Sequence, residues 1–263
     1  MPEEVPVHRF SEWERLDPGI VAGITGVADG EGAESDFDFG LVRGGTTGDV
    51  TRRYVALARL LGMESIAVAR QVHGTRIVEV GPSSEGGVRV GGEADGLLTE
   101  APYILLVVTT ADCVPVYVTR PGGQGIAILH AGWRGAAAGI LESTIERFVD
   151  WYGVGAGDLL VHLGPSICGA CYEVGAAVLG VFGYDGGERS TLDLRAELSD
   201  RATHAGVPAA RVSRSDWCTR CGPVRLHSHR GQGVSAGRMA AFIGRVGDSG
   251  SAPVHADGAR DLR

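Results

Sequence analysis

Two histidines and one cysteine stand at the ends of apolar segments in the middle of the chain. His73, Cys113 and His130 each follow or end a segment with the apolar, β-branched composition of a buried strand. In an α/β fold the ends of neighbouring strands meet at one edge of a sheet, so such residues can lie close together. One thiolate and two neutral imidazoles can hold zinc and leave a fourth position free for water or substrate. We therefore expect an enzyme whose chemistry centres on a metal.

The spacing of these residues means that only the folded chain can bring them together. The separations are 40 residues (113 − 73) and 17 residues (130 − 113), longer than the ligand spacings within a zinc finger. On spacing alone a second interpretation stays open, in which the histidines are hydrogen-bonded strand ends and Cys113 is a small core residue. The neighbouring Asp112 is a catalytic candidate, because its carboxylate could orient a ligand or carry a proton, although it could also cap its own turn.

A glycine-containing turn follows His130 directly. The residues Gly132, Trp133, Arg134 and Gly135 lead into a helix that the apolar spacing predicts over residues 133–152. The N–H groups of such a turn and the helix dipole attract an anion, and Arg134 adds a planar cation. We expect these four residues to bind phosphate. The alternative is that the glycines only permit a sharp turn and that Arg134 pairs with a surface carboxylate.

Two Cys-x-x-Cys pairs occur in the second half of the chain. They are Cys168 with Cys171 and Cys218 with Cys221, and the pairs are 47 residues apart (218 − 171). Because this separation exceeds the loop of a zinc ribbon, turn or core cysteines are the simpler interpretation. A structural zinc held by all four cysteines stays open.

A polar cluster near the end of the sequence is a candidate for substrate contact. His229 and Arg230 belong to the segment His227-Ser228-His229-Arg230. We expect these two residues at the rim of a substrate pocket, and a solvated loop is the alternative.

The composition is that of a globular protein and excludes several functions. The 263 residues are 44% hydrophobic and 21% charged, which suits a large α/β domain with a sizeable core. The net charge of −8 argues against nucleic-acid binding, which needs a basic surface to neutralise phosphates. All 24 basic residues are arginines. The absence of lysine excludes a Schiff base, a lysine-anchored pyridoxal phosphate and a Walker-A lysine.

The sequence predicts neither export nor a membrane span. Residues 1–6 have neither the basic nor the apolar region of a secretory signal. The longest apolar stretch, residues 103–118, is interrupted by threonine, aspartate and proline. We therefore expect a cytoplasmic protein with no membrane partner, in which the five cysteines are reduced.

Apolar periodicity predicts alternating strands and helices. Strands are expected at residues 65–72, 75–80, 103–109, 114–119, 125–130, 159–163 and 239–246, and helices at 49–61, 133–152, 172–181 and 193–205. Residues 81–92 are expected to form a surface loop. The pattern predicts one α/β domain over residues 1–246, built as a three-layer α/β/α sandwich with a mixed sheet, and a mobile tail over residues 247–263.

Six motifs occur in a fixed order along the chain. They are Gln71-Val72-His73-Gly74, Glu93-Ala94-Asp95-Gly96, Thr110-Ala111-Asp112-Cys113-Val114-Pro115, His130-Ala131-Gly132-Trp133-Arg134-Gly135, Leu163-Gly164-Pro165 with Cys171-Tyr172-Glu173-Val174-Gly175, and Gly237-Arg238-Met239. Together they closely resemble the YfiH family, also called multicopper polyphenol oxidase (laccase-like) or peptidoglycan editing factor proteins. The resemblance covers residues 50–245.

This resemblance implies a fold, a metal and a reaction. It implies an α/β/α fold and a zinc site on His73, Cys113 and His130. It also implies phosphorolysis of adenosine, inosine and methylthioadenosine, and deamination of adenosine, with a purine nucleoside and phosphate as small-molecule partners. The laccase label implies copper, and the editing-factor label implies removal of misincorporated serine from a muropeptide precursor.

The sequence also departs from the family at the expected substrate rim. Near the N-terminus the family usually has Thr-Arg followed by Gly-Gly-Val-Ser, and the corresponding segment here, Ile24-Thr25-Gly26-Val27-Ala28-Asp29-Gly30, lacks that arginine. The family's usual Asn-Leu-Gly, Asn-Arg and Ser-Tyr-Arg are replaced by Asp38-Phe39-Gly40, Thr51-Arg52 and Ser228-His229-Arg230. These changes bear on the substrate, whereas the metal ligands are intact.

Two alternatives to the nucleoside enzyme stay open. One is a hydrolase or amidase that uses Cys113 as a thiolate nucleophile on a muropeptide precursor. The other is a non-catalytic interaction protein with a degenerate site. Multi-copper oxidase chemistry ranks last, because it needs many more clustered histidines than these. The oligomeric state is left open.

Overall fold

The structure, a computed structural model, describes residues 5–27, 38–40, 47–82, 86–122, 125–185 and 189–247. Its strands divide between two six-stranded mixed sheets and a two-stranded ribbon. The first sheet has the order β1 (Val7–Arg9), β2 (Ile20–Thr25), β14 (Met239–Arg245), β7 (Ile104–Thr110), β3 (Ser65–Arg70), β5 (Gly87–Glu93). The second has the order β13 (Val212–Arg214), β10 (Leu160–Leu163), β8 (Val114–Thr119), β9 (Ile126–Ala131), β6 (Gly96–Thr99), β4 (Ile77–Glu79). The ribbon pairs β11 (Glu173–Gly175) with β12 (Arg189–Thr191).

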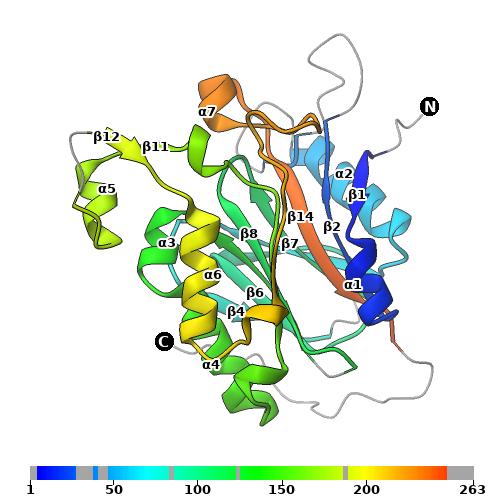
Figure 1. Cartoon of the computed structure of the whole chain (residues 1–263). Coiled ribbons are helices and arrows are strands. Elements are labelled where there is room, and N and C mark those ends of the chain that lie inside the picture. The colour runs from blue at the N-terminus through cyan, green and yellow to red at the C-terminus, as the bar shows by residue number, and fades with distance from the viewer. Residues whose placement is uncertain are drawn as a thin grey trace.

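Helices cover the outer faces of the two sheets. The α-helices are α1 (Ser11–Leu16), α2 (Thr47–Leu60), α3 (Trp133–Ala137), α4 (Ile140–Tyr152), α5 (Ala176–Val181), α6 (Leu194–His204) and α7 (His229–Gln232). Short 3₁₀ turns are η1 (Ala156–Asp158), η2 (Gly169–Cys171), η3 (Ala209–Arg211) and η4 (Gly233–Ser235). Helix α2 packs on the first sheet, and α4 and α6 pack on the second sheet, on the opposite side of the molecule (Figure 1).

The two sheets pack face to face through a layer of apolar side chains. Alanines and branched residues from both sheets fill it, and Tyr117 of β8 donates its hydroxyl across the layer to the carbonyl of Gly23 in β2 at 2.8 Å. Strands β7, β8 and β9 are buried along almost their whole length, as their continuous apolar sequences predict. The mixed α/β fold in one domain is confirmed, and its strands form two packed sheets, which the sequence pattern did not distinguish.

Three local predictions need correction. The helix expected over residues 133–152 is two helices, because Gly139 adopts a left-handed conformation with φ of 85° and ends α3 before α4 begins. The expected loop 81–92 contains the edge strand β5, whose largely exposed side chains give no apolar alternation. The expected helix 172–181 starts as strand β11 and becomes helical only at Ala176.

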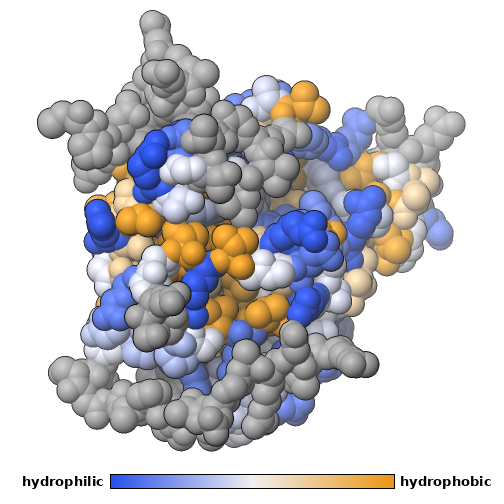
Figure 2. All heavy atoms as spheres, turned by 180° about the vertical axis from the view of Figure 1, so that it is seen from behind, coloured by the Kyte–Doolittle hydropathy of each residue, from blue (hydrophilic) through white to orange (hydrophobic). Residues whose placement is uncertain are grey.

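Two further expectations concern the surface and the end of the chain. In the described ranges, no helix is both long enough and apolar enough to cross a bilayer. Seen from behind, the surface has apolar residues in its middle and hydrophilic residues around them (Figure 2). The predicted tail lies outside the described residues from position 248 onward.

Candidate metal centre and binding pocket

The three predicted metal ligands lie together where the two sheets meet. His73 follows β3, Cys113 lies between β7 and β8, and His130 lies near the end of β9. One nitrogen of each histidine and the cysteine sulfur all lie within 4.8 Å of one another. The two imidazole rings are 4.8 Å apart between centroids and nearly perpendicular. Two nitrogen donors and one sulfur donor at this separation fit one metal ion of the zinc or copper type.

Asp95 fixes the two histidines. Its carboxylate lies fully buried just before β6 and accepts N–H hydrogen bonds from Val72, His73 and Gly74 at 3.1, 2.9 and 2.7 Å. These bonds hold the turn in which His73 adopts a positive φ of 62°, a conformation that is rare for residues other than glycine. The position of the His73 ring therefore depends on a carboxylate 22 residues away in the sequence.

The same carboxylate orients His130. Asp95 Oδ1 lies 2.9 Å from His130 Nδ1. The ionised carboxylate can only accept, so Nδ1 carries the hydrogen and the Nε2 lone pair is free for a metal. Burial would raise the pKa of Asp95, but the hydrogen bonds from His130 and Gly74 outweigh it and lower the pKa. This carboxylate–histidine arrangement is typical of metal sites.

Cys113 and His130 shift each other's pKa in opposite directions. Burial alone would raise the pKa of the Cys113 thiol, but the charges and hydrogen bonds of His130 and His73 lower it to about 6. Burial alone would lower the pKa of His130, but the Cys113 thiolate and the Asp95 carboxylate raise it to about 9. Each group therefore favours the charged form of the other, the thiolate of Cys113 and the imidazolium of His130. A metal ion that binds there displaces the imidazolium proton.

The glycines of the turn after β9 allow close packing beneath the ligands. A Cβ atom on Gly132 would lie 3.0 Å from the His73 ring and 3.1 Å from the Cys113 sulfur. A Cβ atom on Gly135 would lie 2.8 Å from the carbonyl oxygen of Gly74. Both glycines therefore have a steric role, which is close packing and not the sharp turn of the alternative interpretation. The helix that follows has only five residues, so its dipole is smaller than the expected long helix would supply.

A pocket of about 590 Å³ opens over the candidate metal ligands. This volume lies within the range of small-molecule sites. Its lining consists of Gly40, Tyr54, Val68, Ala69, Arg70, Gln71, His73, Val107, Thr109, Thr110, Ala111, Asp112, Cys113, His130, Trp133, Arg134, Tyr172, His229, Arg230 and Arg238. Of the predicted site residues, Gly132 and Gly135 are absent from this wall, and the others line it together.

Arg134 presents a cation to the pocket. Its guanidinium lies 4.3 Å from the centre of the Trp133 ring, which fixes it by a cation–π contact. Within the described residues Arg134 forms no ion pair with a carboxylate. Arg230 faces the same space, with its guanidinium 4.9 Å from the centre of the Tyr172 ring. Arginines in this setting favour an anionic or aromatic ligand.

Asp112 orders the loop that carries the rim residues. Its Oδ1 accepts hydrogen bonds from the hydroxyls of Thr219 and Ser228 at 2.6 and 2.7 Å, and its Oδ2 accepts the N–H of Arg230 at 2.7 Å. The side chain is buried, and its backbone φ of 93° is unusual for a residue other than glycine. Three donors thus converge on its two oxygens. This geometry indicates that Asp112 positions the loop of Arg230, a role that the sequence did not predict, and its catalytic role stays a prediction.

The sequence predicted no role for several residues of the site. Asp95 belongs to the motif Glu93-Ala94-Asp95-Gly96, for which no role was predicted. Its position before a glycine in an apolar region was the only feature that set it apart. Gln71 forms a two-way amide pair with the backbone of Thr109, donating at 2.8 Å and accepting at 2.7 Å, and so joins the end of β3 to β7. Tyr172 and Arg238 line the pocket from segments distant in sequence.

Comparison with known proteins places this geometry in a family. The family described as multi-copper polyphenol oxidoreductase laccase matches residues 23–246. The purine nucleoside phosphorylase YlmD of Geobacillus stearothermophilus is 32% identical over 255 residues, covering 86% of this chain and 90% of that protein. The adenosine deaminase RL5 of an unknown prokaryotic organism is 30% identical and covers 89% of this chain and 99% of that protein.

Solved structures agree with this assignment. The YfiH structure from Bacillus licheniformis has a TM-score of 0.81 at 26% identity and covers 93% of this chain and 98% of its own. The YlmD structure from Geobacillus stearothermophilus has a TM-score of 0.79 at 31% identity and covers 88% of this chain and 94% of its own. The resemblance predicted from the six motifs is confirmed over almost the whole chain, and the protein belongs to the multi-copper polyphenol oxidoreductase laccase (YfiH) family.

Proposed function

We propose that this protein is a zinc-dependent purine nucleoside phosphorylase that accepts adenosine, inosine and methylthioadenosine and also deaminates adenosine. The observation that carries the proposal is that the candidate metal ligands His73, Cys113 and His130 share a pocket with Arg134 and Arg230. Relatives named for both reactions, at about one-third identity, support it. The pocket volume also suits a nucleoside with a phosphate beside it.

Zinc is the metal that we assign to this site. A thiolate, two imidazoles and an open position are a set that catalytic zinc sites use. When bound, zinc supplies Lewis acidity toward a purine atom or an attacking oxygen nucleophile. A single copper ion also takes two histidines and one cysteine. A multi-copper centre does not fit, because the described residues form only one other candidate metal group, and that group consists of four cysteines.

Arg134 and Arg230 hold the phosphate in our proposal. The Arg134 guanidinium can donate two parallel N–H bonds to phosphate oxygens. Arg230 donates from Nη1 to the carbonyl of Glu173 at 2.6 Å and can use its other N–H groups for the phosphate. A phosphate oxygen then forms a bond to C1′ of the ribose while the C1′–N9 bond breaks, and its electron pair leaves with the purine. The products are ribose 1-phosphate and the free base, and the base requires one proton.

Tyr172 is the residue that we assign to deliver this proton. A phenol carries its proton at neutral pH, and burial and the negative charge of Cys113 raise its pKa further, which makes it a weaker acid in the metal-free pocket. It lines the pocket beside Arg230. Asp112 has its oxygens committed to three donors and acts by holding the loop of Arg230 in place. In the deamination, water adds at C6 of adenosine and ammonia leaves, giving inosine.

Product analysis tests this function directly. Zinc-loaded protein is incubated with adenosine or inosine, with and without phosphate, and the products are identified by mass spectrometry. We expect ribose 1-phosphate and free base only with phosphate, and inosine from adenosine without it. If no purine nucleoside is consumed under any condition, the proposal is wrong and the non-catalytic alternative is supported.

A second candidate function has one structural observation in its favour. Cys113, His130 and Asp95 form a cysteine–histidine–carboxylate series, which is also the arrangement of a cysteine hydrolase. A cysteine bound to zinc cannot serve as a free nucleophile, so the two functions differ in thiol reactivity. Alkylation of native, zinc-loaded protein should spare Cys113. Rapid alkylation of Cys113, together with hydrolysis of a muropeptide precursor, would favour the hydrolase.

A further inference from the structure

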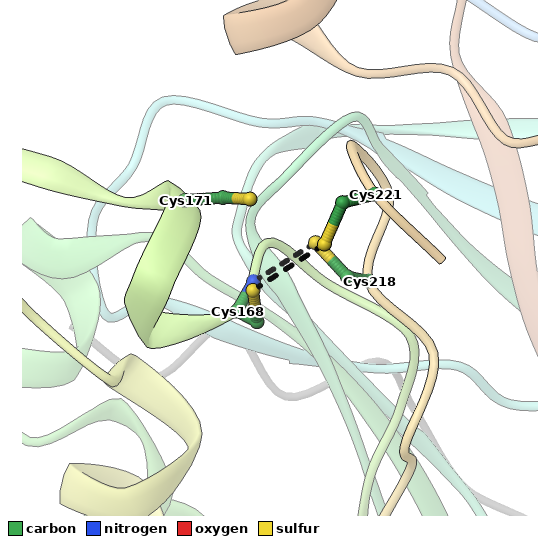
Figure 3. Close-up of side chains that lie close together, drawn as sticks. All are labelled: Cys168, Cys171, Cys218 and Cys221. Carbon is green, nitrogen blue, oxygen red and sulfur yellow. Dashed lines mark hydrogen bonds between the residues drawn. The ribbon is translucent and has the colours of Figure 1, made fainter. Parts of the chain in front are cut away.

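The two Cys-x-x-Cys pairs meet in space although 47 residues separate them in sequence (218 − 171). Cys168 and Cys171 bracket the turn η2, and Cys218 and Cys221 lie on the loop after β13. Their four sulfur atoms lie within 4.8 Å of one another. Figure 3 shows the side chains of both loops directed toward the same small space.

The sulfur positions suit a tetrahedral ion better than a disulfide. Cys168 Sγ and Cys221 Sγ are 3.8 Å apart, and all four cysteines are free. Four sulfurs placed tetrahedrally at about 2.3 Å from a zinc ion lie about 3.8 Å from each other. A disulfide requires a separation of about 2 Å. We infer that Cys168, Cys171, Cys218 and Cys221 bind a structural zinc ion, distinct from the metal of the pocket.

The loop that carries Cys218 and Cys221 folds around the sulfur atom of Cys218. Cys218 Sγ accepts backbone N–H groups of Cys168 at 3.3 Å and Arg220 at 3.4 Å. The N–H of Gly222 closes the turn on the carbonyl of Cys218 at 2.9 Å. A Cβ atom on Gly222 would lie 2.4 Å from that carbonyl oxygen, so the turn requires glycine. Backbone donors aimed at a sulfur stabilise a thiolate, the form that binds metal.

The charge of four thiolates and the coordination number of zinc together indicate a structural role for the ion. Four thiolates within 4.8 Å repel one another strongly unless a cation lies between them. Each thiol loses its proton to water as it binds the ion. Four protein ligands fill the tetrahedral shell, so no position remains for water or substrate. The site therefore stabilises structure and takes no part in chemistry.

The structural zinc joins two loops that build one wall of the pocket. Thr219 lies between Cys218 and Cys221 and donates its hydroxyl to Asp112 at 2.6 Å. Tyr172, whose ring lines the pocket, follows Cys171 directly. The N–H of Thr219 also donates to Ser166 across the two loops at 3.1 Å. Loss of the ion should loosen both loops together.

Metal counting on the full chain tests this inference. Protein is freed of loosely bound ions, and its zinc content per chain is measured by mass spectrometry for the wild type, Cys113→Ala and the double variant Cys171→Ser, Cys221→Ser. We expect two zinc ions in the wild type and one in each variant. If the wild type holds only one zinc ion and Cys113→Ala holds none, the inference is overturned, while the proposed metal of the pocket stands. Two ions in the double variant would also overturn it.

Zinc X-ray absorption of Cys113→Ala serves as a test that does not depend on the double variant folding. The remaining ion should show only sulfur neighbours at about 2.3 Å. In the same variant, the four cysteines should resist alkylation until zinc is removed, and residues 168–172 and 217–222 should then exchange amide hydrogens faster. Nitrogen neighbours at about 2.0 Å, a disulfide between the loops, or four readily alkylated thiols would each contradict the structural zinc.

Discussion

The Asp95 carboxylate binds His130 Nδ1 at 2.9 Å while it accepts the backbone N–H of His73 at the same distance. One buried group thus orients the His130 imidazole and holds the backbone that carries His73, from a position that contributes no metal ligand. The geometry makes Asp95 the main support of the centre, and its removal should affect metal binding before it affects any other part of the fold.

Replacing Asp95 with asparagine should weaken zinc binding about 10- to 100-fold, because a neutral amide holds the imidazole less firmly in its metal-binding tautomer. Zinc affinity is measured by competition with a coloured chelator. Asp17→Asn is the matched control, since Asp17 is also buried and pairs with Arg245 at 2.7 Å outside the pocket. The control should lose stability and keep its zinc affinity. Equal zinc affinities of wild type and Asp95→Asn would refute the role of Asp95.

Replacing Arg134 with alanine should raise the KM for phosphate roughly 10-fold or more, the loss expected from a charge-assisted hydrogen bond. Deamination of adenosine, which needs no phosphate, should change much less. The control is Arg147→Ala, because Arg147 lies 5.3 Å from the Trp151 ring in a similar cation–π pair but outside the pocket. Equal losses in both reactions would show that Arg134 is not a phosphate ligand.

Tyr172→Phe should affect catalysis, whereas Asp112→Asn should affect stability and KM. The first removes only a hydroxyl and should lower kcat for phosphorolysis about 100-fold or more, as expected for a lost general acid, at nearly unchanged thermal stability. The second turns an acceptor oxygen into a donor that faces Thr219, Ser228 or Arg230, so it should lower the unfolding temperature and raise KM. Unfolding curves and steady-state kinetics separate the two. The reverse pattern would make Asp112 the proton carrier.

His162 should make stability depend on pH, far from the pocket. Its ring lies among Phe10, Trp13 and Tyr117, and burial together with the charge of Arg195 lowers its pKa to about 4. An unfolded histidine has a pKa of about 6.5. Between these values the unfolded chain binds a proton that the folded chain does not, so stability is full above pH 6.5 and falls as the pH drops toward 4.

Denaturant unfolding at pH 7 and pH 5 measures this effect. Between pH 7 and pH 5 the free energy of unfolding of the wild type should fall by on the order of 2 kcal/mol because of this group, and the fall in His162→Gln should be smaller by that amount. His204→Gln is the control, because His204 is exposed and should leave the pH dependence unchanged. A His162→Gln variant with the wild-type pH dependence would show that the ring is already charged or accessible.

The sequence predicted the grouping of the candidate metal ligands better than their surroundings. His73, Cys113 and His130 follow or end apolar segments, which made their proximity one of two open interpretations, and the resemblance of the six motifs to a known family favoured it. Asp95 was not assigned a role, because an aspartate before a glycine is also typical of a turn. Only the three-dimensional structure shows four hydrogen bonds converging on its two oxygens.

The long buried strands were predicted, whereas the short buried strand β6 and the assembly of the strands into two sheets were not. Strands β7, β8 and β9 are apolar on both faces, and such sequences do not encode which sheet a strand joins. The break at Gly139 was missed because apolar spacing continues across it, and isolated glycines also occur within helices. The meeting of the four cysteines depends on the path of two loops, which local patterns do not specify.

The most direct measurement loads metal-free protein with zinc in steps and follows phosphorolysis of inosine at each step, for the wild type and for Cys113→Ala. We predict that turnover in the wild type rises in proportion to zinc bound by His73, Cys113 and His130, and that Cys113→Ala stays at background while folded. Full turnover by Cys113→Ala, or by wild-type protein stripped of zinc at this centre, would contradict the account.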